Sequence, residues 1–269
     1  MSNSRPVTLI TGASAGIGAA LARVFAANGH ELMLVARRRT ALDALAGEIA
    51  ARGGKRAHVL DLDLAAPGAA RRIGEAMAAA GVEPDCVVNN AGFGLLGNAA
   101  ERDTQEQLAM IDVNVRALTE LSLAWIEILK RRRGGILNVA SVAAFVPGPR
   151  MAVYYATKAY VLSFSQALGY ELKDSGVRVC ALCPGPVPTE FQARAGFQAD
   201  RRTSRQSLPA ERVAEAGYRG LMRGDAVAIP GFYNKVVAIG TRFIPRKHLL
   251  ALVDNWQRRR QPPEPSPPA

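Results

Sequence analysis

Short apolar runs alternate with longer amphipathic stretches along most of the chain. Runs of this length and composition are typical of strands that are buried on both faces of a sheet. We expect six such strands within residues 7–11, 31–36, 55–64, 84–89, 134–141 and 177–183, and a seventh at 226–229.

The stretches between these runs have the apolar spacing of helices that bury one face. We expect helices from the glycine turn at residue 12 to about Asn28, at 40–52, from Pro67, at 101–132, at 151–174 and from Pro209. This alternation predicts an α/β fold with an open parallel sheet and helices on both faces.

Domain organisation follows from composition. No break in composition interrupts residues 1–230, so we expect one domain there, with a helical extension of the same domain at 231–260. The polar, turn-rich segment 190–207 is expected to be a mobile lid, and the proline-rich end at 261–269 is expected to be disordered.

The net charge is +11, because 34 lysines and arginines outnumber 23 acidic residues. Such an excess can serve nucleic acid, an anionic membrane or an anionic ligand. The arginine clusters are scattered over different expected elements, and no nucleic-acid motif accompanies them. We therefore interpret most of them as a solvated surface and expect no nucleic-acid partner.

The cysteines are few and odd in number, at Cys86, Cys180 and Cys183, and the N-terminus shows no leader-like segment. We therefore expect a reducing, cytoplasmic location. Cys180 and Cys183 fall on one expected strand and face opposite sides of it, and the three histidines lack metal-ligand spacing. We expect no metal site.

A glycine-rich turn, Gly12-Ala-Ser-Ala-Gly16-Ile-Gly18, follows the first strand and opens a helix. Glycines let the backbone approach a pyrophosphate, and the helix N-terminus favours its charge. A plain structural turn is the alternative. The second strand ends in Ala36 and three arginines instead of the carboxylate that would select NAD. We expect Arg37 to bind a 2′-phosphate, and hence NADP as cofactor, although these arginines could simply open the next helix.

Ser141, Tyr154 and Lys158 form the strongest candidate for catalysis. Tyr154 and Lys158 lie four apart on an expected helix, so both side chains project from one face. A nearby ammonium favours the phenolate, so we expect Lys158 to lower the pKa of Tyr154. Ser141, at a strand end, would hold the substrate oxygen that Tyr154 protonates. The alternative is a packing tyrosine and a solvated lysine.

Three further features need an explanation. Asp63 stands just before the helix expected at Pro67, so its carboxylate could meet an adenine edge, with Asp61 as its competitor. The small-residue turn at 89–92 lets backbone pass close to a ligand. Asn114 lies inside an expected helix, where asparagine is unfavourable.

Together these motifs resemble the short-chain dehydrogenase/reductase family over about residues 5–230. The matching segments are TGASAGIG at 11–18, NNAG at 89–92, Asn114, Ser141, YYATK at 154–158 and PGPVPT at 184–189. Each is weak alone, but their order and spacing are specific. The resemblance implies a single-domain, Rossmann-like, doubly wound sheet of about seven parallel strands and a nicotinamide cofactor.

The resemblance also implies roles. Tyr154 would be the general acid/base and Ser141 would orient the carbonyl. Lys158 would bind the nicotinamide ribose, and Asn114 would hold a water in a proton relay. Tyr154 is preferred over Tyr155 because only it has lysine four residues later. The implied cofactor-binding residues are Gly12, Ser14, Gly16, Ile17, Gly18, Arg37, Asp63, Asn90, Ala91, Gly92, Tyr154, Lys158, Pro184, Gly185, Val187 and Thr189.

The resulting hypothesis is an NADP(H)-dependent oxidoreductase acting on a carbonyl or secondary alcohol. The alternative is a dinucleotide sensor without chemistry, which would not need the intact Ser141, Tyr154 and Lys158. A lipophilic substrate is expected, because these apolar residues cluster in sequence around the site: Phe93, Leu95, Leu96, Val142, Phe145, Val146, Phe191 and Phe197.

Association is expected on two grounds. The resemblance implies a homodimer or homotetramer that pairs through the helices at 101–132 and 151–174. Apolar and basic residues alternate in 231–260, a pattern that can lie on an anionic membrane. We favour the simpler interpretation, in which this extension packs over the substrate pocket or a subunit interface.

Overall fold

The fold is built on one seven-stranded parallel sheet in the order β3-β2-β1-β4-β5-β6-β7. The computed structural model describes residues 4–55, 57–197 and 207–260. The strands are β1 (Arg5–Thr11), β2 (Leu32–Ala36), β3 (His58–Asp61), β4 (Val82–Asn89), β5 (Gly135–Val139), β6 (Arg178–Leu182) and β7 (Val227–Ala228). The expected α/β architecture with about seven parallel strands is confirmed.

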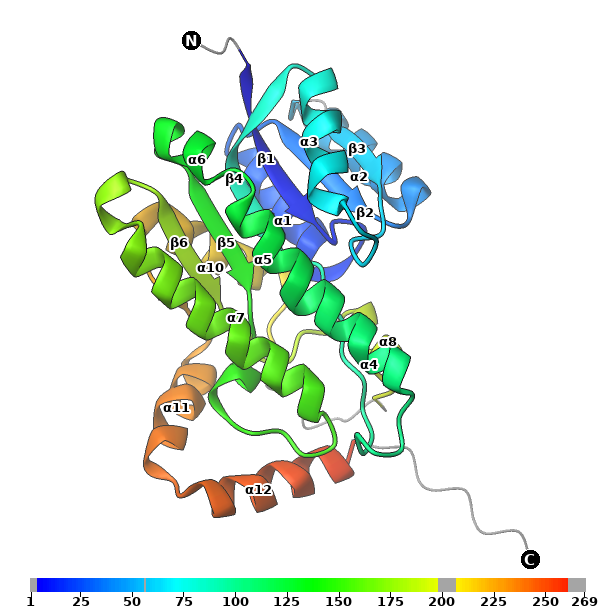
Figure 1. Ribbon diagram of the computed structural model, residues 1–269, viewed down its shortest axis with the longest axis vertical. Coiled ribbons are helices and arrows are strands. Elements are labelled where there is room, and N and C mark those ends of the chain that lie inside the picture. Colours follow the sequence, from blue (N-terminus) through cyan, green and yellow to red (C-terminus); the bar gives the residue numbers. More distant parts are fainter. Residues whose placement is uncertain (1–3, 56, 198–206, 261–269) are drawn as a thin grey trace, which may run out of the picture.

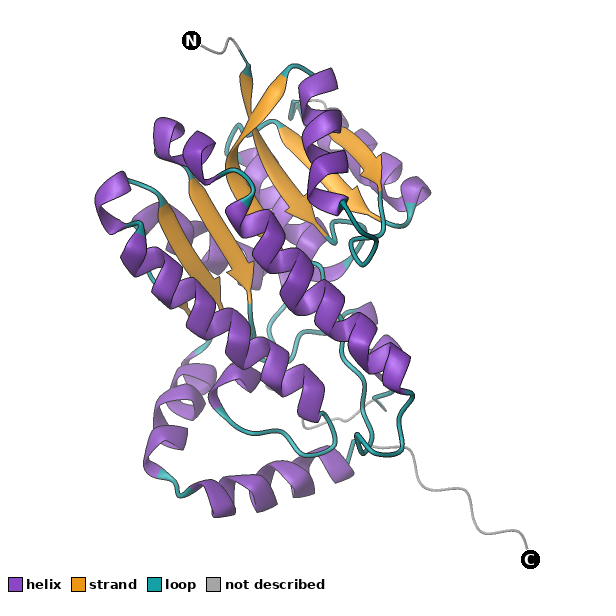
Figure 2. Cartoon of the chain, in the orientation of Figure 1, coloured by secondary structure: helices purple, strands orange, loops and turns teal. Residues whose placement is uncertain are grey.

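Helices cover both faces of this sheet (Figures 1 and 2). One face carries α1 (Gly16–Ala27), α2 (Arg39–Ala51) and α10 (Ala210–Arg223). The other face carries α3 (Ala69–Ala79), α5 (Leu118–Leu123), α6 (Ile126–Arg132) and α7 (Ala152–Glu171), and α4 (Thr104–Ile111) precedes α5. Two separate apolar layers, one on each face, hold the three-layer arrangement together.

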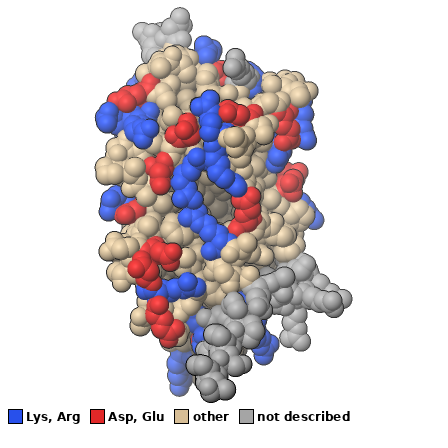
Figure 3. Space-filling view, turned by 90° about the vertical axis from the view of Figure 1, so that its right-hand side faces the viewer, with Lys and Arg blue, Asp and Glu red and all other residues tan. Residues whose placement is uncertain are grey.

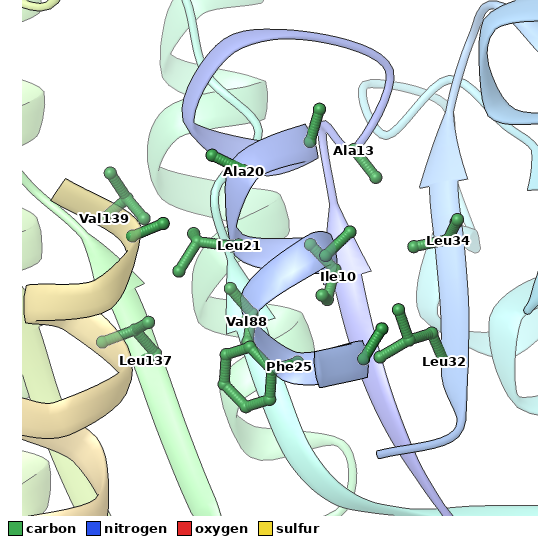
Figure 4. Close-up of a cluster of buried hydrophobic side chains, with 14 of the residues drawn as sticks. Ile10, Ala13, Ala20, Leu21, Phe25, Leu32, Leu34, Val88, Leu137 and Val139 are labelled. Atoms are coloured by element: carbon green, nitrogen blue, oxygen red, sulfur yellow. The ribbon is translucent and has the colours of Figure 1, made fainter. Parts of the chain in front are cut away.

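Most buried strand positions are apolar, which is why both faces of the sheet can be covered, and the buried polar ones, Thr8, Thr11, Asn89 and Asn138, make hydrogen bonds. β2 is buried at every residue, and so is β5. Figure 4 shows Leu21 and Phe25 of α1 lying against Ile10 and Val88 of the two central strands. Burial of side chains this large stabilises the fold by about 1.5–3 kcal/mol each.

The order in which successive strands join the sheet reverses between β1 and β4, although the two strands are parallel. β2 and β3 lie on one side of β1, whereas β4 to β7 lie on the other. The loops after β1 and β4 therefore separate at their carboxyl ends and leave a crevice, where ligands bind in open α/β sheets. The glycine turn after β1 and the turn at 89–92 after β4 both lie at this crevice.

The segment expected as one helix at 101–132 is interrupted twice. A π-helical turn, η1 (Asp112–Ala117), links α4 to α5, and a break at Trp125 separates α5 from α6. The third strand occupies only His58–Asp61 of the expected 55–64, and α3 begins at Ala69, two residues after Pro67.

The C-terminal residues form two further helices at the end of the molecule remote from the N-terminus (Figure 1). They are α11 (Phe232–Gly240) and α12 (Arg246–Arg258), joined by the short turn η4 (Thr241–Phe243). The lid segment contributes α8 (Glu190–Ala195), and the rest of the expected lid at 198–206 lies outside the described residues, as does the tail at 261–269. Among the described helices, none is both long and apolar enough to cross a membrane.

Candidate functional site

A cavity of about 1090 Å³ lies at the carboxyl edge of the sheet. Its wall comes from the turns after β1 and β4, the ends of β2 and β5, the loop after β6, and α7, α8, α11 and α12. Figure 3 shows a hollow in the surface with basic side chains along one side and acidic ones along the other. Charged residues lining the cavity include Arg37, Arg38, Arg194, Asp63 and Glu190.

The glycine turn is folded so tightly that side chains are excluded from it. Gly12 and Gly16 have φ of +64° and +55°, which L-residues rarely adopt. A Cβ at Gly12 would lie 2.8 Å from Asn90 Nδ2, and one at Gly18 would overlap the carbonyl oxygen of Gly12. Asn90 Nδ2 donates to the carbonyl of Thr11 at 2.9 Å, which ties the turn after β4 to the turn after β1.

The N-terminus of α1 faces this turn without a protein cap. Ala15 supplies no side-chain hydrogen bond there, and no acidic residue stands in the first turn of the helix. The first backbone N–H groups therefore remain available to an anion, whose charge the helix dipole favours. A side-chain-free cradle at an uncapped helix N-terminus fits the pyrophosphate of a dinucleotide.

The three arginines after β2 have different surroundings. Arg38 Nη2 donates to the Ser14 carbonyl at 3.3 Å and pairs with Glu190 Oε2 at 2.8 Å. Arg39 is turned toward the helix side, where it pairs with Asp43 and Asp61. Arg37 and Arg38 line the cavity and Arg39 does not.

The cavity lining also distinguishes the two candidate aspartates, Asp61 and Asp63. Asp61 is held by Arg39 and is absent from the cavity wall, whereas Asp63 lines it. Asp63 Oδ1 accepts from the backbone N–H of Ala65 at 3.0 Å, which orients the carboxylate. The placement therefore favours Asp63 for contact with an adenine edge.

Tyr154 and Ser141 meet across the cavity. Ser141 follows β5 and caps the short turn η2 (Val142–Phe145), where its Oγ accepts from the backbone N–H of Ala143 at 3.1 Å. Tyr154 lies in the first turn of α7, with its ring against Phe191 of α8 at 5.4 Å. Burial raises the pKa of Tyr154, and a hydrogen bond with the Ser141 side chain partly opposes this rise.

Lys158 lies one turn further along α7 and is 5% exposed. Its Nζ donates to the carbonyl of Val139 at 2.8 Å and lies 5.9 Å from the centroid of the Tyr154 ring. Burial lowers the pKa of Lys158 to about 8. Desolvation is the largest effect on the pKa of Tyr154, and Ser141 and Arg260 oppose it. A lowering of this pKa by Lys158 stays a prediction.

Asn114 lies in the π-helical turn η1, fully buried. Its Oδ1 accepts from the N–H of Phe93 at 3.1 Å, and its Nδ2 donates to the Phe93 carbonyl at 2.9 Å and to Thr157 Oγ1 at 3.1 Å. Single π turns inside α-helices are frequent at functional sites. The asparagine thus ties the loop after β4 to α7, beside Lys158, with its side chain fully engaged by protein.

The loop after β6 closes the remaining side of the cavity. The Pro184 carbonyl accepts from the N–H of Val142 at 2.9 Å, which joins this loop to the loop carrying Ser141. Gly185 packs against the buried Asn234 of α11, where a Cβ would overlap the amide. The Thr189 side chain would lie 3.0 Å from a Cβ at Gly16, so the loop touches the glycine turn.

Nearly all of the residues named from the sequence line one cavity. Asn114 is the one expected catalytic residue that does not line the cavity, and Gly18 is the one expected cofactor residue that does not line it. Among the residues expected to form an apolar pocket, Phe93, Val142, Val146, Phe191 and Phe197 line the cavity. Leu95, Leu96 and Phe145 do not line it. Leu96 and Phe145 pack into apolar clusters next to the cavity.

The sequence analysis favoured an extension at 231–260 that packs over the substrate pocket or a subunit interface, and α11 and α12 do line the cavity, but the individual contacts of α12 were not predicted. Gln257, fully buried, donates from Nε2 to the Tyr155 hydroxyl at 2.8 Å, and Asp254 pairs with Arg150 at 2.8 Å. These contacts hold α12 against the loop before α7 and direct the Tyr155 hydroxyl to Gln257. The four-residue spacing of Leu249, Val253 and Gln257 on one face of the helix was the available signal.

Arg194 was also missed. Its guanidinium lies 4.2 Å from the centroid of the Phe93 ring, in the cavity wall. Burial lowers its pKa, with a further lowering from Arg37 and an opposing effect from Asp63. α8 therefore brings a third arginine into the cavity wall, between Phe93 and the charged residues Arg37 and Asp63.

Comparisons with known proteins point in the same direction. The family model described as short chain dehydrogenase matches residues 6–199. "Short chain dehydrogenase MYCFIDRAFT_6125" of Pseudocercospora fijiensis is 36% identical over 188 residues, covering 69% of this chain and 60% of that protein. The chain spans 32% of another relative, "Probable oxidoreductase EphD" of Mycobacterium bovis.

Two solved structures match along almost the whole chain. "Short-chain dehydrogenase from Sphingobium yanoikuyae in complex with NADPH" has a TM-score of 0.78 and 31% identity, covering 97% of this chain and 99% of that one. A 7beta-hydroxysteroid dehydrogenase structure has a TM-score of 0.82 and 25% identity, covering 93% and 96%.

Proposed function

The chain belongs to the short-chain dehydrogenase family, and from this premise we propose that it is an NADP(H)-dependent oxidoreductase. Its substrate would be the carbonyl or secondary alcohol of a lipophilic small molecule. One observation carries the proposal. Tyr154, hydrogen-bonded to Ser141 and followed one turn later by the buried Lys158, shares a cavity with an uncapped helix N-terminus and a glycine cradle.

In this proposal Tyr154 is the proton donor for reduction. When bound, the nicotinamide supplies or accepts the hydride. The Tyr154 phenol is protonated near neutral pH, since its ordinary pKa of about 10 is raised further by burial, and it has a proton to give to a substrate oxygen. The same rise makes the phenol a weaker acid, so the transfer needs a group that stabilises the phenolate. The Ser141 hydroxyl holds that oxygen in place, and the Lys158 ammonium stabilises the phenolate that remains.

Asn114 acts indirectly. Its bonds to Phe93 and Thr157 fix α7 relative to the loop after β4. A Cβ at Gly92 would lie 2.9 Å from Asn114 Oδ1 and 3.5 Å from Lys158 Nζ, so these groups are packed together beneath the cavity. Asn114 is therefore proposed to position Lys158.

The preference for NADP rests on charge at the end of β2. Ala36 stands where a carboxylate would accept from the ribose 2′-hydroxyl, and Arg37 and Arg38 line the cavity beyond it. A guanidinium can pair with a 2′-phosphate through two hydrogen bonds. The similar Sphingobium yanoikuyae dehydrogenase is described in complex with NADPH, which supports the same choice.

A lipophilic substrate is supported by the lining of the far end of the cavity. Val146, Phe191 and Phe197 contribute apolar surface next to Tyr154, and α11 and α12 add more. In this proposal residues 1–230 are the catalytic domain and 231–260 extend it over the substrate end. The similar structure described as a hydroxysteroid dehydrogenase fits a large apolar substrate.

We also propose a homodimer or homotetramer. Large apolar side chains are exposed on the helices that the family resemblance implies as pairing surfaces: Leu108, Leu123 and Tyr170 are 46%, 49% and 71% exposed. Pairing through α4, α5 and α7 would bury them. Sedimentation velocity on the full chain measures this directly.

The proposed function is tested by a substrate screen. NADPH and NADH absorbance is followed in parallel against a panel of aliphatic, aromatic and steroid-like ketones and aldehydes. We expect consumption of NADPH with the bulky apolar ketones, and no consumption by the Tyr154→Phe variant. Silence across the panel while NADPH still binds would overturn the catalytic proposal in favour of a dinucleotide sensor.

A further inference from the structure

The outer side of α11 carries a continuous row of exposed apolar side chains. Phe232, Val236, Ile239 and Phe243 recur at i, i+4, i+7 and i+11, which places them along one side of α11 and η4. Their exposed fractions are 83%, 50%, 59% and 83%. This set, called here the α11 stripe, forms part of the end of the molecule formed by α11 and α12 (Figure 1).

Only basic charges accompany the stripe in the surrounding sequence. No aspartate or glutamate occurs in residues 226–253, whereas Lys235, Arg242, Arg246 and Lys247 do. All four are exposed, and we call them the basic rim. The acidic residue that follows this segment, Asp254, already pairs with Arg150 and Arg258. Asp225 lies beside Phe232, Lys235 and Ile239, where it pairs with Arg223. The patch is therefore apolar with a mainly basic rim.

We propose that the α11 stripe and its basic rim dock on an anionic lipid surface. Phenylalanine and isoleucine side chains gain from entering the boundary between headgroups and acyl chains, and cations beside them are attracted to anionic headgroups. The charge of the patch argues against a second copy of this chain as its binding partner. Pairing this patch with itself across a two-fold axis would bring the basic rim of one copy toward that of the other.

The stripe is continuous with the substrate end of the cavity. Val236 belongs to both, and the neighbouring Tyr233, Ile244, Leu252 and Trp256 are exposed and line the cavity. A lipophilic molecule in the lipid surface would thus face the cavity without crossing open water. This consequence rests on the proposed function, but the docking itself does not.

The test uses the full chain and vesicles of phosphatidylcholine with or without phosphatidylglycerol. We expect co-sedimentation with the anionic vesicles, weakened by salt, and at most weak co-sedimentation with pure phosphatidylcholine. No binding to the anionic vesicles, or equal binding to both, overturns the proposal. Neither result depends on turnover, so failure of docking is distinguishable from failure of the proposed enzyme activity.

Two double variants separate the apolar and basic contributions. Phe232→Ser with Phe243→Ser should weaken binding to anionic vesicles at least about tenfold, because two large apolar side chains are lost. The matched control is Tyr170→Ser, which removes an exposed aromatic residue from α7. Because Tyr170 belongs to the proposed pairing surface, the control is used where its sedimentation mass equals that of the native protein, and its vesicle binding should then be unchanged. Equal losses in both proteins would overturn the assignment of the surface.

The charge variant is Arg242→Glu with Lys247→Glu, and it should also weaken binding at least about tenfold. Its control, Arg71→Glu with Arg72→Glu, changes the net charge equally on α3 and should have a much smaller effect. Turnover of a water-soluble ketone and the sedimentation mass are measured on every variant. If the stripe variant lowers the sedimentation mass and leaves vesicle binding intact, the stripe is a subunit interface and the proposal is wrong.

Discussion

Replacing Lys158 by methionine removes a cation from a buried, desolvated position. The side chain is 5% exposed, and its ammonium donates a hydrogen bond to the Val139 carbonyl at 2.8 Å. A catalytic role would explain why such a costly arrangement is kept. We therefore expect Lys158→Met to stabilise the folded chain while it abolishes turnover.

The magnitude follows from the pKa of Lys158. Burial lowers it from an ordinary 10.5 to about 8. At about 1.4 kcal/mol per tenfold change in proton affinity, keeping the ammonium charged near neutral pH costs the folded state about 3 kcal/mol. The variant also loses the hydrogen bond to Val139, which lowers its free energy of unfolding by about 1 kcal/mol. The net expectation is a gain of about 2 kcal/mol in the free energy of unfolding.

The dependence on pH has a definite sign. The folded-state pKa lies below the unfolded one, so the folded state binds fewer protons between about 8 and 10.5. Stability of the native protein should therefore rise with pH across this window and should be lowest, as far as Lys158 is concerned, below it. The advantage of the methionine variant should shrink over the same window.

The assay is urea unfolding of both proteins without cofactor, near neutral pH and again near the upper end of this window. Turnover and NADPH binding are measured on the same preparations. A variant that is less stable than the native protein near neutral pH would refute the reasoning, because it would show that Lys158 is stabilised by its surroundings. A stability difference that does not change with pH would refute the assigned pKa.

Three other substitutions test separate parts of the site. Gly18→Ala should abolish NADPH binding or folding, since the added Cβ overlaps backbone that cannot move; thermal unfolding with and without NADPH distinguishes the two. Arg37→Ser with Arg38→Ser should raise the KM for NADPH at least about tenfold and leave that for NADH nearly unchanged, as steady-state kinetics would show. Gln257→Leu leaves the buried Tyr155 hydroxyl unpaired and should raise the KM for bulky ketones more than it lowers kcat.

The fold was predictable because its strands are apolar on both sides. Residues such as Ile10, Val35 and Val88 are fully buried in one apolar layer or the other. Their short apolar runs therefore predicted a parallel sheet from the sequence alone. The cavity was predictable for a related reason. Gly12, Asn90 and Ser141 each follow a strand, and the carboxyl ends of parallel strands meet at one edge.

Other features depend on contacts between distant residues. The π turn contains Asn114, whose amide contacts Phe93 and Thr157. An asparagine inside an expected helix marked this position in the sequence, but it did not indicate a π turn or these partners. The pairing of Gln257 with Tyr155 joins positions 102 residues apart, so no local pattern contains it. The roles of the individual site residues remain predictions, because geometry places them together without showing turnover.

The most direct test of the central claim compares Tyr154→Phe with Tyr155→Phe in a single-turnover reduction at saturating NADPH. The two changes remove the same hydroxyl from adjacent residues of α7. Our account predicts that Tyr154→Phe binds NADPH as the native protein does and loses at least about 10²-fold in rate, whereas Tyr155→Phe keeps most of it. An unimpaired rate for Tyr154→Phe would contradict the account.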